Sequence, residues 1–241
     1  MGLHRATGVP ANVDSACVRL WLEEVAARLA AERDFLTQLD AAIGDADHGV
    51  NMHRGFTVVM ARIERLDGAT PGQLLRTAGR SFVSTVGGAA GPLYGTAFLQ
   101  AGDVLGDEPE FGRRRLGEAL RAALDGVQRV GAATEGEKTM VDAFAPGLAA
   151  YELGVRNGGS LETAVSGARE ASAEGMRATI PMQASKGRAS YLGPRSVGHQ
   201  DPGATSTALM FAALEDAVLA DRSRRFAAGV HGPGRGSAVR P

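Results

Sequence analysis

The sequence predicts an all-α protein, one domain of eight antiparallel helices arranged as an up-and-down bundle or barrel. Hydrophobic residues make up 44% of the 241 residues, but aromatic residues only 5%. The interior must therefore be filled mainly by Ala, Leu, Val and Met, which suit close-packed helices better than a β-sandwich. Eight stretches of helical character follow one another with short connections, and no strand pair, repeat or linker stands out between them. A single helical bundle or barrel is the simplest fold for this pattern.

The first helix is expected at about residues 14–38. Its apolar residues, such as Val18 and Leu22, recur at spacings of three and four, and Asp14 or Ser15 would cap it. The same reasoning gives seven further helices at about 52–66, 71–84, 92–105, 111–130, 139–157, 160–178 and 204–221.

Helix signals also mark two of the connections. Thr70 is a typical N-cap, and Pro71 is a typical first helical residue. Residues 157–160, Asn-Gly-Gly-Ser, combine a glycine stop with a serine start, which predicts a tight antiparallel hairpin. The helical domain is expected to span residues 1–221, and the Arg- and Gly-rich residues 222–241 are expected to form a disordered tail.

Charge and cysteine content argue against several functions. A formal net charge of −1 and a pI near 6.5 give no reason to expect nucleic acid or an anionic membrane as a partner. The single Cys17 excludes an intramolecular disulfide, and no long apolar segment suggests export or membrane insertion, so a cytoplasmic protein is expected. Among the 26 basic residues only Lys138 and Lys186 are lysines, which makes these two positions conspicuous.

Four connections contain more Gly, Asp, His and charged residues than a simple turn requires. They lie at residues 43–51, 86–92, 136–142 and 186–203. In an alternating bundle, the loops that join odd to even helices share one end, so loops far apart in the sequence can meet at one ligand.

Asp40, Asp45 and Asp47 place three carboxylates within eight residues, around the end of the first helix. Without a cation they would repel one another, and hard oxygen ligands suit Mg²⁺ or Ca²⁺ rather than Zn²⁺. Gly44 and Gly49 allow the backbone to turn sharply between the ligands. A metal site is therefore favoured over the alternative of helix-capping aspartates.

Two familiar carboxylate sites do not fit this loop. An EF-hand counted from Asp45 would need glycine at its sixth position and glutamate at its twelfth, but these positions hold Val50 and Phe56. A phosphatase nucleophile of the Asp-x-Asp type usually follows an apolar strand, whereas Asp40 ends a helix. A site for a metal-bound phosphate remains as the interpretation of this loop.

The glycine-rich residues 87–92 precede a helix, and free amides at a helix start suit a phosphate, although such glycines also occur as plain turns. Neither a Walker A motif nor a dinucleotide fingerprint is present. His48 and His199 lie in turns beside aspartates, where an orienting role is commoner than general-base catalysis. No side chain is assigned as catalytic.

The segments 39–52, 86–95, 136–142 and 186–205 together resemble the ADP-binding L subunit of bacterial dihydroxyacetone kinase. The likeness spans roughly residues 14–220. The same domain forms the C-terminal half of single-chain, ATP-dependent dihydroxyacetone kinases.

The resemblance implies an eight-helix antiparallel barrel with a nucleotide, ADP or ATP, and two Mg²⁺ ions at one end. It implies that Asp40, Asp45 and Asp47 ligate the metals. The residues that it implies for the nucleotide and its phosphates are His48, Gly49, Val50, Asn51, Ala89, Ala90, Gly131, Met140, Arg188, Asp201, Pro202 and Gly203.

One departure concerns the phosphate loop, where family members commonly have Ala-Ser and this chain has Ala89-Ala90. The missing hydroxyl removes one possible donor to a phosphate oxygen, which costs about 1 kcal/mol at most, while the backbone amides remain.

In the family, dihydroxyacetone is held on a separate K subunit, and an M subunit of the phosphotransferase system recharges the bound ADP. The resemblance therefore implies a subunit that is inactive alone. Phosphoryl transfer mainly requires positioning and charge neutralisation, so no covalent nucleophile is needed. Two alternatives stay open: an ATP-exchanging kinase subunit for a related ketose such as erythrulose, and a non-catalytic nucleotide sensor that regulates transcription.

Overall fold

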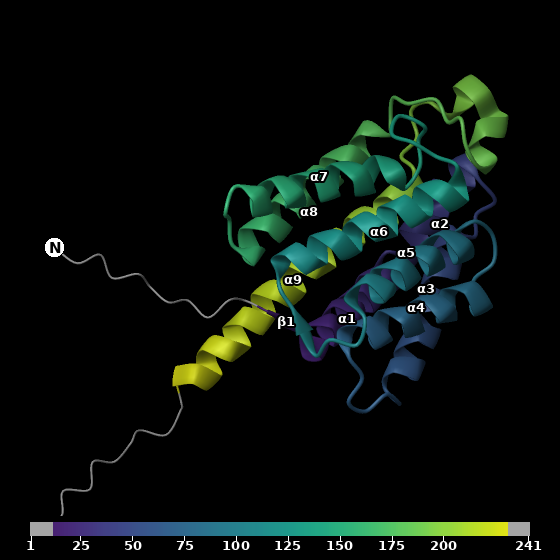
Figure 1. The fold of residues 1–241 in the computed structure, drawn as a ribbon. Helices are drawn as coiled ribbons and strands as arrows, with labels where there is room; N and C mark the ends of the chain where they lie inside the picture. The colour runs from purple at the N-terminus through teal and green to yellow at the C-terminus, as the bar shows by residue number, and fades with distance from the viewer. Residues whose placement is uncertain (1–11, 231–241) are drawn as a thin grey trace, which may run out of the picture.

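The computed structural model describes residues 12–230, and these residues are mainly helical (Figure 1). The mainly helical character that the sequence predicted is confirmed. The elements in chain order are β1 (Val13–Asp14), α1 (Ser15–Ala31), α2 (Arg33–Ile43), α3 (His48–Ile63), α4 (Pro71–Thr85), α5 (Ala90–Leu105), β2 (Glu110–Phe111), α6 (Arg113–Gly131), α7 (Val141–Arg156), α8 (Leu161–Ala178), the 3₁₀-helix η1 (Arg188–Ser196) and α9 (Pro202–Val230).

Side-chain caps fix the starts of three helices where the sequence predicted them. The Asp14 carboxylate accepts a hydrogen bond from the backbone N–H of Cys17 at the start of α1. At the start of α4, Thr70 and Gln73 form a reciprocal capping box, with Pro71 as the first helical residue. Ser160 caps α8 in the predicted hairpin after α7.

The helix expected at 14–38 is in fact two helices, which meet at Glu32 and continue to Ile43. Residues 30–33 contain neither Gly nor Pro, and the apolar spacing runs on into α2, so the sequence gives no sign of this break. The following helix begins at His48 rather than near residue 52. Only residues 44–47 therefore separate α2 from α3, which makes the aspartate loop tighter than expected.

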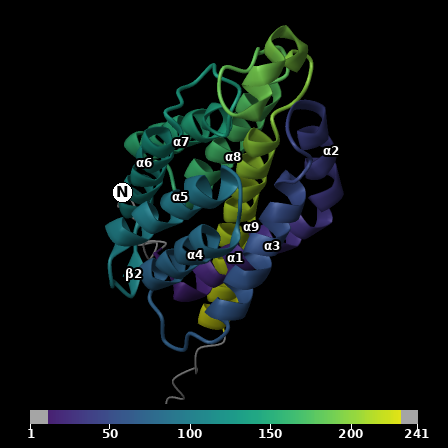
Figure 2. The ribbon, with the colours of Figure 1, turned by 90° about the vertical axis from the view of Figure 1, so that its right-hand side faces the viewer.

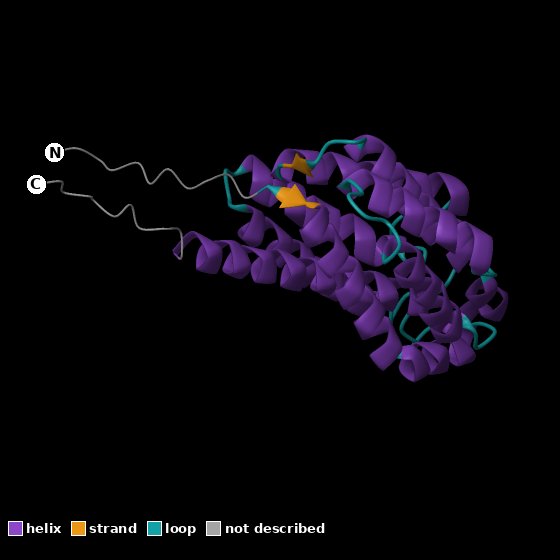
Figure 3. Cartoon of the chain, turned by 90° about the horizontal axis from the view of Figure 1, so that it is seen from below, coloured by secondary structure: helices purple, strands orange, loops and turns teal. Residues whose placement is uncertain are grey.

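A short strand pair, which the sequence did not predict, joins two distant parts of the chain. β1 and β2 are antiparallel, with Val13 opposite Phe111 and Asp14 opposite Glu110. Figure 3 shows both strands at the end of the bundle where α9 finishes. With two residues each, the strands are too short to show the alternating pattern by which strands are recognised.

The expected disordered tail is partly wrong, because α9 continues to Val230 and residues 222–230 are helical. Arg222 pairs with Glu162 of α8 at 2.7 Å, and Arg225 pairs with Asp14 at 2.7 Å. These ion pairs hold the basic residues against the bundle, although the end of α9 projects beyond the other helices (Figure 1). The rest of the expected tail, residues 231–241, lies outside the described residues.

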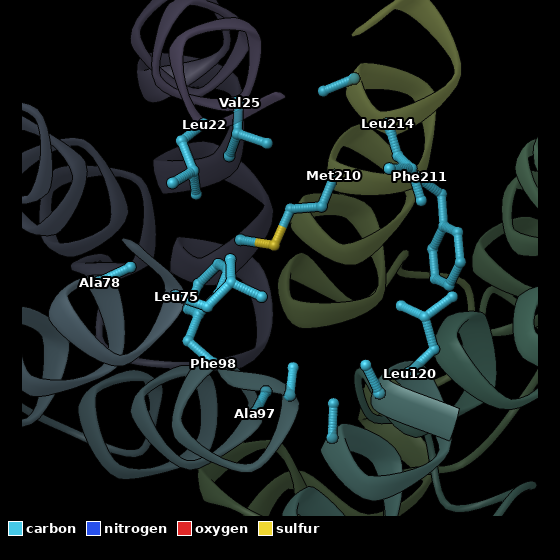
Figure 4. Close-up of a cluster of buried hydrophobic side chains, with 14 of the residues drawn as sticks. Leu22, Val25, Leu75, Ala78, Ala97, Phe98, Leu120, Met210, Phe211 and Leu214 are labelled. Carbon is cyan, nitrogen blue, oxygen red and sulfur yellow. The ribbon is translucent and has the colours of Figure 1, made fainter. Parts of the chain in front are cut away.

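Eight of the helices contact one another in a closed order, α1, α3, α4, α5, α6, α7, α8, α9 and back to α1, while α2 packs outside this ring against α3. Figure 4 shows apolar side chains of α1, α4, α5, α6 and α9 pointing toward a common centre. Leu22, Phe98 and Met210, for example, come from three different helices and are at least nine-tenths buried. Among residues 12–230, no helix is both long and apolar enough to span a bilayer.

This order of packing has a consequence for the loops. Helices α3, α5, α7 and α9 begin at one end of the molecule, where α2 and α6 finish. Backbone N–H groups at the helix starts and carbonyl groups at the helix ends are therefore concentrated at the same place, together with the connecting loops.

Candidate metal and phosphate site

An open cavity of about 260 Å³ lies at the end of the molecule where these helices begin. The first residues of α3, α5, α7 and α9 all line it. Thirteen of the fifteen residues predicted for the site meet there: Asp40, Asp45, Asp47, His48, Asn51, Ala89, Ala90, Gly131, Met140, Arg188, Asp201, Pro202 and Gly203.

Gly49 and Val50, the other two, do not line the cavity. Gly49 is buried against α2, where an added Cβ would lie 1.9 Å from the carbonyl oxygen of Arg33 and 2.6 Å from Oγ1 of Thr37. Glycine is therefore required there for the packing of α3 on α2. Val50 is 49% exposed, and its contact with nucleotide stays a prediction.

Carboxylate oxygens of Asp40, Asp45 and Asp47 all lie within 4.8 Å of one another. Asp40 belongs to the last turn of α2 and is 8% exposed, while the other two lie in the loop before α3. Oδ2 of Asp40 accepts hydrogen bonds from the backbone N–H groups of Asp47 at 2.8 Å and His48 at 3.1 Å. The loop is thus folded around one carboxylate, and the three acidic groups offer the oxygen donors that Mg²⁺ prefers.

Gly44 makes this arrangement possible. A Cβ built on Gly44 would lie 2.0 Å from Oδ1 of Asp40, so any larger residue would displace the carboxylate. Two residues further on, Ala46 adopts a φ of 61°, a left-handed conformation that is uncommon outside glycine. Gly44 and the left-handed conformation of Ala46 thus allow the loop to bring the three carboxylates together.

Arg188, the first residue of η1, supplies positive charge beside the aspartate loop. Its guanidinium lies 2.9 Å from Oδ2 of Asp45, and both side chains are partly exposed. Such a pair is weak in water and can exchange partners easily. A phosphate in the cavity would offer Arg188 a second anionic partner without any large movement of the backbone.

The glycine loop before α5 leaves space and free amides. A Cβ at Gly87 or Gly88 would meet nothing within 4 Å, and Gly88 has a φ of 63°. Ala89 stands at the N-cap of α5 and offers no side-chain hydrogen bond to the first turn. The amides at this helix start therefore face the cavity without a side-chain acceptor, which is the arrangement found at anion sites.

A buried chain of hydroxyl groups connects the cavity to the core. Nε2 of His48 lies 2.9 Å from Oγ of Ser206, and this oxygen lies 2.6 Å from the phenol oxygen of Tyr94. Burial lowers the pKa of His48 to about 4 and raises the pKa of Tyr94 to about 12. His48 is therefore neutral at physiological pH, in keeping with the orienting role expected for it.

Asp201 marks the start of α9. Its Oδ2 accepts a hydrogen bond from the N–H of Ala204 at 2.7 Å, and its own N–H donates to Oγ1 of Thr179 at 3.0 Å. Burial raises its pKa to about 7, and the nearby Lys138 ammonium opposes this shift. The carboxyl is thus held in place by the backbone at a point where it also faces the cavity.

The prediction missed several residues of the cavity wall. Lys138, Thr139 and Lys186 line it, as do Gly187 and Tyr94. The sequence does offer a sign of the two lysines, because they are the only lysines in an arginine-rich chain. Tyr94 had none, since nothing in the sequence shows that it meets a serine more than a hundred residues away.

Residues 42–216 match the DAK2 domain family. The chain is 40% identical over 194 residues to the ADP-binding subunit DhaL of the PEP-dependent dihydroxyacetone kinase of Escherichia coli, which covers 80% of this chain and 92% of the relative. It is 35% identical over 198 residues to the ADP-binding subunit DhaL of the PTS-dependent dihydroxyacetone kinase of Lactococcus lactis, covering 82% and 95%.

A solved structure has the same fold. The dihydroxyacetone kinase of C. freundii in complex with AMP-PNP and Mg²⁺ superimposes with a TM-score of 0.66 at 25% sequence identity. The superposition covers 90% of this chain and 36% of that kinase, so the chain spans little more than a third of the longer protein. The chain belongs to the DAK2 domain family, together with the ADP-binding DhaL subunits of dihydroxyacetone kinases.

Proposed function

We propose that the chain is the nucleotide-binding subunit of a dihydroxyacetone kinase, which transfers a phosphoryl group from a Mg²⁺-bound nucleotide to dihydroxyacetone held on a separate K subunit. One observation supports this most strongly: three clustered carboxylates and the uncapped amides of α5 line the same cavity. A polyphosphate bridged by divalent cations has the complementary chemistry.

Each part of the cavity then has a task. Asp40, Asp45 and Asp47 hold two Mg²⁺ ions, which neutralise charge on the phosphates when bound. The glycine loop and the amides at the start of α5 hold phosphate oxygens, with Ala89 and Ala90 contributing backbone only.

The remaining wall suits the nucleoside and closes the site. Met140, which is 5% exposed, and Gly131 both line the cavity, so they offer apolar surface for a base. Arg188 exchanges its pairing with Asp45 for a phosphate oxygen. The proposed phosphoryl transfer requires no covalent nucleophile from the cavity.

The acceptor and the donor are supplied by partners. The chain matches nearly the full length of stand-alone ADP-binding subunits, which favours a K subunit for dihydroxyacetone and an M subunit of the phosphotransferase system for recharging ADP. The closed order of eight helices favours the antiparallel barrel expected for this family. We place the reaction in the cytoplasm, where nucleotide and phosphotransferase system are both available.

The assay that tests this proposal combines the purified chain with a K subunit, an M subunit with its phosphoryl donor, and dihydroxyacetone. Formation of dihydroxyacetone phosphate is expected only when the chain and the K subunit are both present. Turnover by the chain alone would contradict the proposal, and so would an unchanged rate when the chain is omitted.

The same mixture separates the alternatives. Replacing dihydroxyacetone by erythrulose tests the related ketose, and replacing the M subunit by ATP tests whether the nucleotide exchanges. A chain that holds nucleotide but supports no transfer to either sugar would favour a nucleotide-sensing regulator.

A further inference from the structure

Lys138 is a buried lysine of the cavity wall to which the proposed function assigns no role. Its side chain is 1% exposed, in a chain that uses arginine at all but two of its 26 basic positions. Its φ is 59°, a left-handed conformation that non-glycine residues adopt rarely and at some cost. A buried ammonium is tolerated only where acceptors surround it.

The acceptors of Lys138 are two backbone carbonyl groups that are far apart in sequence. Nζ donates to the carbonyl oxygen of Thr179 at 2.6 Å and also to the carbonyl oxygen of His199. Thr179 directly follows α8, and His199 comes three residues before α9. One ammonium group therefore joins both ends of the connection between these helices.

We call this connection, residues 180–200, the covering segment. It forms one wall of the cavity through Lys186, Gly187, Arg188 and Ala189. Figure 2 shows it, in light green, beside the end of α2.

The covering segment touches the metal-binding side of the cavity in two ways. Ala184 and Ala189 form a small apolar cluster with Ile43, three residues after Asp40. Arg188 pairs with Asp45. The position of the segment is thus coupled directly to the aspartate loop.

Two other hydrogen bonds close the base of the covering segment beside the ammonium. The N–H of Gly198 donates to the carbonyl oxygen of Ile180 at 2.8 Å, and the N–H of Asp201 donates to Oγ1 of Thr179. Both are bonds between neutral groups. Hydrogen bonds from a charged donor are roughly twice as strong, so the ammonium is the strongest tie at this point.

We propose that Lys138 is a positioning residue that ties the two ends of the covering segment together and thereby keeps bound nucleotide in the cavity; this rests on the proposed function of the cavity. A compact ammonium can reach two carbonyl oxygens that converge at a buried point. The guanidinium of arginine is larger and planar and presents its donors in a fixed fork, which suits two converging carbonyl oxygens less well. This gives a physical reason why lysine persists at position 138 in a chain that otherwise uses arginine.

The test compares Lys138→Met and Lys138→Gln with the wild type and with Arg115→Met. Met keeps most of the length of the side chain and removes all donors, while Gln keeps a neutral amide that can serve one carbonyl. Arg115 of α6 lies outside both the cavity wall and the covering segment and pairs with Glu118 at 2.7 Å, so Arg115→Met removes one positive charge there and is the control. Hydrogen–deuterium exchange of the full chain without nucleotide reports on the covering segment, and release of a fluorescent ADP analogue reports on the cavity.

We expect faster exchange in residues 180–200 of Lys138→Met, a smaller effect in Lys138→Gln, and no change in the segment for Arg115→Met. Release of the ADP analogue should accelerate on the order of tenfold in Lys138→Met, with little change in its association rate. If Lys138→Met does not fold, the same two measurements on Lys138→Gln test the proposal, and an intermediate effect is expected.

Several results would overturn the proposal. Exchange that rises evenly through all helices would mark Lys138 as a general core residue. Weaker nucleotide binding with unchanged exchange in the covering segment would show that Lys138 acts on the nucleotide directly. If the wild type binds no nucleotide but the segment still loosens in Lys138→Met, the proposed function fails while the structural tie stands.

Discussion

At the residue scale, four aspartates, Asp40, Asp45, Asp47 and Asp201, line the cavity. Burial raises the pKa of the Asp201 carboxyl to about 7, and the carboxylates of Asp142 and Asp40 add to the shift. An acid with a raised pKa binds its proton more tightly in the folded state than in the unfolded state. Its contribution to stability is therefore present at low pH and is lost as the pH rises from the unfolded value, near 4, through about 7.

Asp201→Asn should remove this pH dependence, because an amide carries no charge and its oxygen can still accept the hydrogen bond from Ala204. In the absence of nucleotide and divalent cations, the difference in Tm between variant and wild type is expected to be more positive at about pH 8 than at about pH 5. Thermal melts across this range measure it. A difference that stays constant with pH would show that the carboxyl of Asp201 does not titrate as stated.

A second residue-scale prediction concerns Gly44. Gly44→Ala places a methyl group where the Asp40 carboxylate lies, so Mg²⁺ affinity should fall at least on the order of tenfold, the loss expected when ligand orientation is disturbed. Gly167→Ala is the matched control, because its Cβ would meet nothing within 4 Å and it lies within α8. Calorimetric titration with Mg²⁺ and ADP compares the two. Equal affinity in both variants would contradict the role given to Gly44.

At the scale of single elements, the sequence predicted most helices because their signals are local. Capping residues such as Thr70 and Ser160 act over one turn, and apolar spacing acts over two or three. The break at Glu32 and the helix η1 lack such local signals. Tertiary contacts decide these features, and one sequence does not display them.

The capping box of α4 provides a test at this scale. Thr70→Ala removes the acceptor for the N–H of Gln73, which should lower the free energy of unfolding by about 1 kcal/mol. Thr57→Ala is the control, because the hydroxyl of Thr57 is exposed and bonds only to a carbonyl group within α3. Denaturant unfolding of both variants measures the difference. A loss at position 70 no larger than at position 57 would show that the cap contributes little.

At the scale of the whole molecule, the convergence of four distant loops at one cavity was predicted from the alternation of helix directions. Thirteen residues of the predicted site do meet there. The contact of Tyr94 with Ser206 and the tie from Lys138 to His199 could not be predicted, since they join segments whose distance in space depends on the complete packing of the helices.

The end of α9 contributes to the fold but lies far from the cavity. Truncation after Asp221 removes the pairs of Arg222 with Glu162, of Arg225 with Asp14, and of Arg224 and Arg225 with Asp221. The arginine side chains are 45–65% exposed, so each pair is worth about 1 kcal/mol or less. We expect a small drop in Tm and unchanged nucleotide retention. Loss of nucleotide from the truncated chain would contradict this separation.

The central claim is that the carboxylates of Asp40, Asp45 and Asp47 hold divalent cations, which in turn hold a polyphosphate. Native mass spectrometry of the purified chain, loaded with ADP and Mg²⁺, tests it most directly. The account predicts a mass increase for nucleotide plus magnesium in the wild type and in an Asp67→Asn, Asp103→Asn, Asp125→Asn control, and no such increase when all three site aspartates are replaced by asparagine. Full retention of ADP and Mg²⁺ by that last variant would contradict the account.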